Sequence, residues 1–105
     1  MARTPEGKVE DYFVDECAVY GALVRKLAYV GPRGAPDRMV VWGSKVYDWD
    51  AGRLPPKIDF VELKASGQKP DPHQEREHER LRALGCNVFV IDSKEAVDRY
   101  IAMRK

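Results

Sequence analysis

Two short segments constrain this chain most, because each couples a strand-like apolar run to a carboxylate. The first, Gly-Ala-Pro-Asp-Arg at 34–38, leads into an apolar run that ends at Trp42. The second, Ile-Asp-Phe-Val-Glu-Leu-Lys, occupies residues 58–64. Short runs rich in β-branched and aromatic residues predict strands, and Gly34 and Pro36 predict a turn before the first of them. Asp37 is therefore expected at the start of a strand.

Side chains alternate between the two faces of a strand, and this sorts the polar residues of the second segment. Glu62 and Lys64 share one face and lie roughly 7 Å apart along the strand. Asp59 and Leu63 share the opposite face. If the two strands pair, Asp37 comes close to Glu62.

Two carboxylates beside a lysine indicate a particular chemistry. The negative charges repel each other and favour Mg²⁺ or Mn²⁺ between them. Such a cation lowers the pKa of a bound water and stabilises charge on a phosphate, and a lysine can orient that water. A Glu-x-Lys triplet alone fits a solvated strand edge equally well. The Pro-Asp turn and Gln74 downstream favour the catalytic interpretation.

Three helices are expected around these strands. The first spans residues 8–20 and carries Glu10 in its first turn, where a glutamate also stabilises the helix dipole. The second spans about 71–84, with Gln74 on the stripe that faces the core, although a capping-box glutamine would explain that residue equally well. The third follows the capping pair at 92–93.

Further strands are expected at 22–29 and 86–92, and the strongly apolar second one is predicted to be a buried central strand. The order of elements indicates a mixed α/β layer with a central sheet. Residues 43–57 form an insertion with a short strand near its middle. Its aromatic residues Tyr47 and Trp49 would stack on bases, pack in a dimer or pack onto the core.

Length and composition narrow the class of protein. With 105 residues, of which 44% are hydrophobic, the chain is expected to form one domain over residues 1–105. No run is long and apolar enough for a membrane span and no signal peptide is visible, so we expect a cytoplasmic protein. A net charge of +1 argues against nucleic-acid binding through bulk charge and leaves room for a local basic surface.

The cysteines and histidines do not predict a zinc site. Cys17 and Cys86 are too few for a disulfide framework and are predicted to be buried thiols. Their spacing to His73 and His78 fits no known finger or ribbon. We do not expect a histidine to act as the catalytic base, because a metal ion together with Lys64 would make such a base unnecessary.

Together these residues resemble a VRR-NUC domain, within the PD-(D/E)xK nuclease superfamily. The resemblance runs from about Val9 to Val97. It rests on Val9-Glu10, Lys26, residues 34–38, residues 61–64, Gln74 and Leu84-Gly85. It implies a restriction-endonuclease-like α/β fold, in which a central mixed sheet is flanked by helices.

The resemblance also implies a site and a cofactor, Mg²⁺ or Mn²⁺. The implied metal ligands are Glu10, Asp37, Glu62 and the backbone carbonyl of Leu63. The implied catalytic residues are Asp37, Glu62, Lys64 and Gln74. Among these, Lys64 would orient or activate the attacking water and Gln74 would position it. The implied DNA contacts are Lys26, Arg33, Arg38 and Lys69.

Stand-alone chains of this kind resemble viral or phage proteins that act on branched DNA such as Holliday junctions. The resemblance therefore implies a phage-encoded, metal-dependent DNA endonuclease, and a homodimer because resolving a junction needs two symmetric cuts. A helicase or recombination partner is left open. The alternatives are a non-specific DNA nickase and a non-catalytic DNA-binding module that keeps the fold. The second is disfavoured because the acids, the lysine and the glutamine all remain.

Overall fold

The computed structural model describes residues 4–44, 47–48 and 52–105, with the backbone alone at 47, 48 and 53. The elements follow one another in the order α1 (Pro5–Val19), β1 (Leu23–Lys26), β2 (Arg38–Trp42), β3 (Tyr47–Asp48), β4 (Gly52–Arg53), β5 (Lys57–Leu63), α2 (Pro72–Ala83), β6 (Asn87–Ile91) and α3 (Lys94–Arg104). Each described helix is too short or too polar to cross a membrane.

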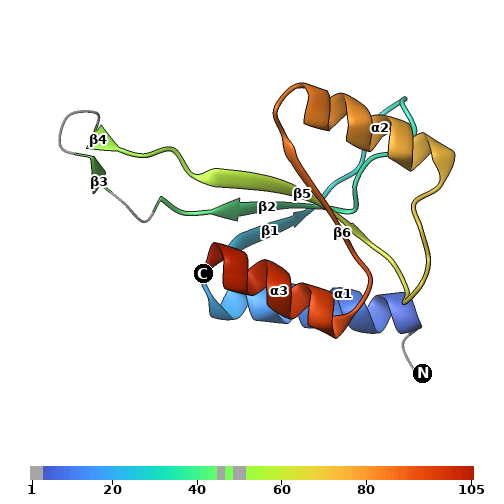
Figure 1. Ribbon diagram of the computed structural model, residues 1–105, viewed down its shortest axis with the longest axis horizontal. Coiled ribbons are helices and arrows are strands. Elements are labelled where there is room, and N and C mark those ends of the chain that lie inside the picture. The colour runs from blue at the N-terminus through green and yellow to red at the C-terminus, as the bar shows by residue number, and fades with distance from the viewer. Residues whose placement is uncertain (1–3, 45–46, 49–51) are drawn as a thin grey trace.

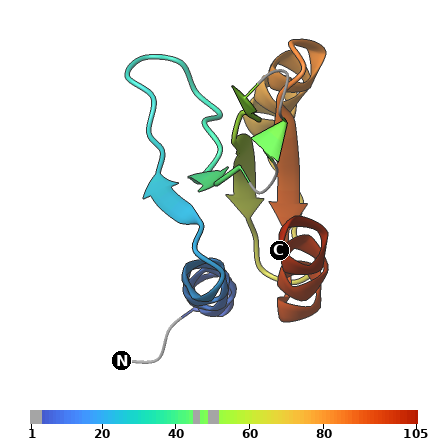
Figure 2. The same cartoon turned by 90° about the vertical axis from the view of Figure 1, so that its left-hand side faces the viewer.

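The main sheet has the strand order β1-β2-β5-β6 (Figure 1). Strand β2 pairs antiparallel with β1 and with β5, whereas β5 and β6 pair parallel. Helices α1 and α3 lie together on one face of the sheet, and α2 lies on the other face beside β6 (Figures 1 and 2). This arrangement confirms the predicted α/β fold with a mixed central sheet flanked by helices.

The core lies between the sheet and the pair α1 and α3. Val61 and Leu63 of β5 are fully buried on this face, as the predicted alternation requires. The rings of Phe13 in α1 and Tyr100 in α3 lie 5.6 Å apart, centroid to centroid. Burying one large apolar side chain contributes about 1.5–3 kcal/mol, so these few residues hold the two helices on the sheet.

Local capping explains where the outer helices begin. Helix α1 begins at Pro5 rather than at Lys8, because Oγ1 of Thr4 accepts a hydrogen bond of 3.0 Å from the backbone of Gly7. A proline in the first turn loses no helical hydrogen bond. Helix α3 is capped by Ser93, as the sequence predicted.

Two expectations about the apolar pattern are wrong. Strand β6 lies at the edge of the sheet rather than at its centre, and Val90 is 38% exposed. Its apolar sequence reflects packing on both faces, because Phe89 meets Tyr100 edge-on while α2 lies over the opposite face. Helical spacing would also extend the core-facing stripe of α2 to Leu84, but this side chain is 84% exposed at the end of the helix.

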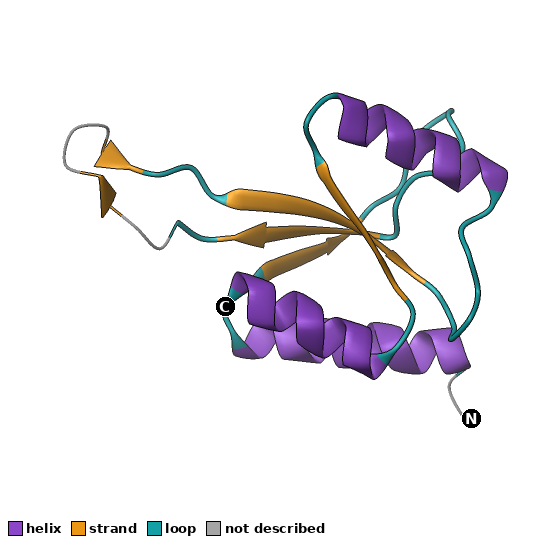
Figure 3. Cartoon of the chain, in the orientation of Figure 1, coloured by secondary structure: helices purple, strands orange, loops and turns teal. Residues whose placement is uncertain are grey.

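The insertion at 43–57 contains the predicted short strand. Strand β3 pairs antiparallel with β4, which the sequence did not predict, and the resulting hairpin projects beyond the end of the main sheet (Figures 1 and 3). The side chains of Tyr47 and Trp49 lie outside the described residues, so their predicted roles stay predictions. The strand predicted at residues 22–29 is also present, but it is shorter: β1 spans Leu23–Lys26.

Candidate active site

The two carboxylates predicted to meet do lie side by side. Strands β2 and β5 pair with Arg38 opposite Val61, which places Asp37 beside Glu62 at the ends of the two strands. Oδ2 of Asp37 accepts a hydrogen bond of 2.7 Å from the backbone N–H of Leu63. Glu62 is 1% exposed and points to the face of α2.

The loop before Asp37 is packed against the start of α2. Gly34 has a φ of 95°, and a Cβ built on it would lie 2.4 Å from the carbonyl oxygen of His73. Only glycine fits both the left-handed backbone and this close approach. Farther along α2, the hydroxyl of Tyr29 donates to Glu77 over 2.6 Å. The loop that presents Asp37 is therefore fixed to the helix that presents Gln74.

Gln74 makes both of the contacts that the sequence left as alternatives. Its Oε1 accepts from the backbone of Asp71 and its own backbone donates to Oδ1 of Asp71, each over 2.9 Å, so the capping box is complete. Its Nε2 donates to Oε2 of Glu62 over 3.0 Å. Capping thus orients the amide toward the carboxylate.

Lys64 reaches the same carboxylate from the residue after β5. Its Nζ lies 3.8 Å from Oε2 of Glu62, and its side chain is 16% exposed. Its backbone N–H donates to Ile91 over 2.9 Å, which carries the pairing with β6 past the end of the strand. The ammonium group is therefore held at the acids with access to solvent.

His78 is a site residue that sequence reasoning missed. It lies one turn after Gln74 on α2, is 2% exposed, and places Nε2 3.4 Å from Oε1 of Glu62. The signal was present, because residues four apart on a helix share a face. The sequence placed His78 on the same side of the helix as Gln74, but it was considered for chemistry only as a zinc ligand or a base.

Burial and neighbouring charge shape the electrostatics of the acid pair. Burial raises the pKa of Glu62 to about 9, and a hydrogen bond with Asp37 and the charge of Asp37 act in the same direction. The charge of Lys64 opposes them. Without a cation Glu62 therefore retains its proton near neutral pH.

Glu10 does not join this pair. Its Oε1 accepts a hydrogen bond from Arg38, which ties α1 to the start of β2. Over the described part of the chain, no three His, Cys, Asp or Glu side chains form a group that could hold a metal. Glu10, a predicted metal ligand, and Arg38, a predicted DNA contact, are thus paired with each other in this structure.

The other predicted DNA contacts are exposed. Lys26 is the last residue of β1 and lies opposite Arg38, at the end of the sheet where the acids lie. Arg33 lies in the loop that precedes Asp37, and Lys69 lies in the loop before α2. No described contact assigns them a structural role, and their role in DNA binding stays a prediction.

The opposite face of β5 carries a separate polar network. Asp59 is fully buried, accepts from the hydroxyl of Tyr100, and receives two hydrogen bonds of 2.8 and 2.9 Å from Arg104. These contacts link β5 to α3 away from Glu62. They keep Asp59 on the face of β5 opposite Glu62, as the alternation of side chains predicted.

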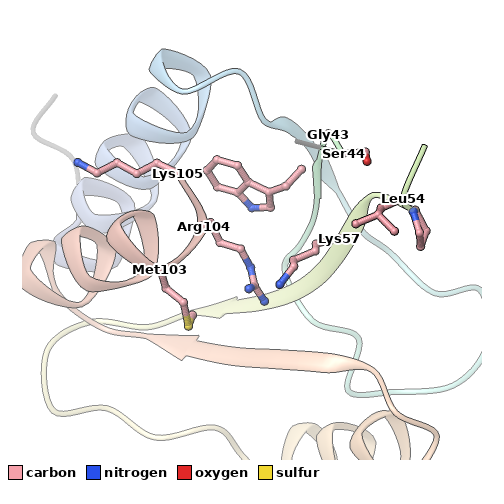
Figure 4. Close-up of a pocket in the computed structure, with 9 residues that line it drawn as sticks. Gly43, Ser44, Leu54, Lys57, Met103, Arg104 and Lys105 are labelled. Atoms are coloured by element: carbon pink, nitrogen blue, oxygen red, sulfur yellow. The ribbon is translucent and has the colours of Figure 1, made fainter. Parts of the chain in front are cut away.

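A hollow on the described surface lies away from these residues. A cavity of about 300 Å³ opens at the other end of β2 and β5, between the C-terminus of α3 and the segments that lead to the β3–β4 hairpin (Figure 4). Its lining includes Trp42, Lys57 and Met103. None of the acids or the predicted catalytic residues lines it.

The known proteins that are similar to this chain include a phage protein and a solved structure. No family model matches the chain. A curated protein of Acyrthosiphon pisum secondary endosymbiont phage 1, named "Putative nuclease p44", is 43% identical over 90 residues, which span 86% of this chain and 85% of that protein. A solved structure described as "VRR_NUC domain" is also 43% identical, with a TM-score of 0.79, over 98% of this chain and all of the other.

Proposed function

The chain belongs to the VRR-NUC family of nucleases, and we propose that it is a metal-dependent DNA endonuclease that acts on branched DNA. The observation that carries the proposal is the meeting of Asp37, Glu62 and Lys64 at the ends of β2 and β5, with Gln74 above them. A buried acid beside a second carboxylate and a lysine is costly to maintain and is typical of functional sites.

The residues present fit a hard divalent cation. Asp37 and Glu62 supply oxygen ligands, and one buried oxygen of Glu62 has no hydrogen-bond partner among the residues that the structure describes. The backbone carbonyl of Leu63 and the side chain of Glu10 are further candidate ligands; Glu10 would first have to leave Arg38. When bound, Mg²⁺ or Mn²⁺ lowers the pKa of water and stabilises charge on the phosphate.

The chain's own residues supply the rest of the chemistry. Lys64 orients or helps to activate the attacking water, and its ammonium group stabilises charge that develops on the phosphate. Gln74 keeps Oε2 of Glu62 in place through its amide. Lys26, Arg33 and Lys69, which are exposed, contact the phosphates of the DNA, and Arg38 adds to them once Glu10 releases it.

A junction resolvase must cut two strands symmetrically, so the active form is a homodimer. One surface suits a self-complementary contact. Leu23, Val41 and Ile58 lie in one row across β1, β2 and β5, and Leu23 and Ile58 are 45% and 46% exposed. The phage origin of the p44 relative supports a phage-encoded protein that acts in the cytoplasm of a bacterial host.

Cleavage assays with defined substrates test this function. A labelled four-way junction, a linear duplex and a single strand are each incubated with Mg²⁺, with Mn²⁺ and with a chelator. Metal-dependent, paired nicks in the junction support the resolvase. Equal cutting of all substrates would replace it with a non-specific nickase. DNA binding without any cleavage would favour the non-catalytic binding module.

A further inference from the structure

The roles proposed for the acids, the lysine and the glutamine leave one buried side chain of the site unexplained. His78 is 2% exposed, and its Nε2 lies 3.4 Å from Oε1 of Glu62, which is 1% exposed. Both atoms are buried without a hydrogen-bond partner among the described residues. Buried polar atoms are rarely left unpaired, so their mutual approach needs an explanation.

We propose that His78 is a positioning residue, which fixes the carboxylate of Glu62 by donating its Nε2–H to Oε1. The proposal rests on the metal-dependent function above, because Glu62 is fixed for the sake of a cation. Carboxylates that bind metals are commonly held by hydrogen bonds from neighbouring side chains, and loss of such a neighbour weakens metal binding.

The contacts of Glu62 divide between its two oxygens. Gln74 donates to Oε2 over 3.0 Å and His78 faces Oε1. Two donors on different oxygens fix the plane of a carboxylate, whereas a single donor leaves it free to turn. Both donors stand on α2, four residues apart, so one rigid helix holds the ligand.

The chemistry of the ring agrees with a donor role. A neutral imidazole carries one N–H, on Nδ1 or on Nε2. Placing that proton on Nε2 pairs two buried atoms that have no other hydrogen-bond partner among the described residues.

A competing explanation is that His78 only fills space beneath α2. Two substitutions separate the explanations. His78→Phe keeps a flat ring of similar size and removes the donor, whereas His78→Gln keeps an N–H near the position of Nε2. Glu79→Gln is the matched control, because Glu79 is the next residue on α2 and is exposed.

The readout is direct binding of Mn²⁺, measured by titration calorimetry on the folded chain without DNA. We expect His78→Phe to weaken binding about 10- to 100-fold. His78→Gln should stay within a few-fold of wild type, and Glu79→Gln should bind as wild type does. Far-ultraviolet circular dichroism establishes that each variant is folded.

Two results would overturn the proposal. A folded His78→Phe variant that binds Mn²⁺ as tightly as wild type removes the positioning role, as does equal loss in His78→Gln and His78→Phe. Failure of the wild-type chain to bind Mn²⁺ instead contradicts the metal-dependent function. In that case thermal unfolding of His78→Phe, Glu62→Gln and the double variant still decides: additive shifts in Tm refute the contact, and non-additive shifts establish it.

Discussion

Glu62 is a carboxyl group whose charged form is disfavoured by its surroundings in the metal-free chain. Its pKa is raised to about 9 by burial and by Asp37, whereas an unfolded chain has the ordinary value of 4.5. The raised pKa means that its contribution to stability is fully present below pH 4.5 and is lost as the pH rises through 9. A functional acid of this kind is maintained at the expense of stability.

Replacing Glu62 with glutamine should therefore stabilise the metal-free protein while it abolishes cleavage. We expect Glu62→Gln to raise the free energy of unfolding by about 1–2 kcal/mol at pH 8 and by little at pH 4.5. Chemical denaturation in the presence of a chelator measures both. Glu79→Gln, the same change on an exposed residue, should have no effect. Equal stability of Glu62→Gln and wild type at pH 8 would contradict the raised pKa.

Lys64 and Asp37 should be needed for chemistry rather than for folding. Lys64→Ala and Asp37→Ala each remove one charged group from the candidate site, and we expect cleavage to fall at least about 100-fold. Circular dichroism and most of the DNA affinity should be kept. Lys8→Ala, at an exposed position of α1, is the control. Wild-type cleavage by either site variant would mean that the active site lies elsewhere.

At the scale of elements, the loop between β1 and β2 is a supporting part of the site. Gly34 lets this loop approach the first turn of α2, and the loop carries Asp37. Gly34→Ala should destabilise the chain by about 1–3 kcal/mol and lower cleavage, since Asp37 and Gln74 are pushed apart. Thermal unfolding and the junction assay measure the two effects.

Gly21 provides the control for that substitution. It also has a positive φ, 82°, but nothing lies within 4 Å of an added Cβ. Gly21→Ala therefore reports the backbone strain alone, about 1 kcal/mol, with cleavage unchanged. Equal loss of activity in both variants would show that the contact with α2 is not what positions Asp37.

The link between β5 and α3 should matter for stability without touching the chemistry. Asp59→Ala removes the carboxylate that pairs with the buried guanidinium of Arg104, which should cost about 3–5 kcal/mol. Asp98→Ala, which removes an exposed acceptor of Tyr12, should cost under about 1 kcal/mol. Denaturant titration measures both. Any Asp59→Ala protein that folds should still cleave, because Asp59 faces away from Glu62.

The elements that the sequence predicted correctly are those with strong local signals. Alternation along β5 and the Pro-Asp turn were enough to bring Asp37 to Glu62 once the strands paired. The cap at Asp71 likewise fixed the start of α2. By contrast, the edge position of β6 could not be predicted. An apolar run indicates that both faces of a strand are buried, but it does not indicate how many strands pair with it.

Contacts between segments that are distant in the sequence could not be predicted either. The pair of Glu10 with Arg38 joins residues 28 apart and depends on how α1 lies across the sheet. The role of His78 depends on the packing of α2 against β5, although its spacing from Gln74 pointed to the right face. Periodicity orders side chains on one element, whereas the site is assembled from three: the start of β2, the end of β5 and α2.

At the scale of the whole molecule, the candidate active site and the row of exposed apolar side chains lie on the same face of the sheet. Glu62 and Ile58 are four residues apart on β5, and alternation places them on one side. Helix α2 lies beside β6 and leaves the row on β1, β2 and β5 partly exposed. A second copy docked through this row would bring two active sites onto one side of a dimer, as two cuts in a single junction require.

The mass of the protein in solution tests that arrangement. Light scattering should give twice the mass of one chain, and Ile58→Asp should return it to one chain, because a charge in an apolar contact is costly to bury. With the dimer lost, paired cuts in the junction should become single nicks. Leu84→Asp makes the same change at the exposed end of α2 and should stay dimeric. A wild-type monomer at working concentration would argue strongly against a resolvase, whereas a dimeric Ile58→Asp would place the interface elsewhere.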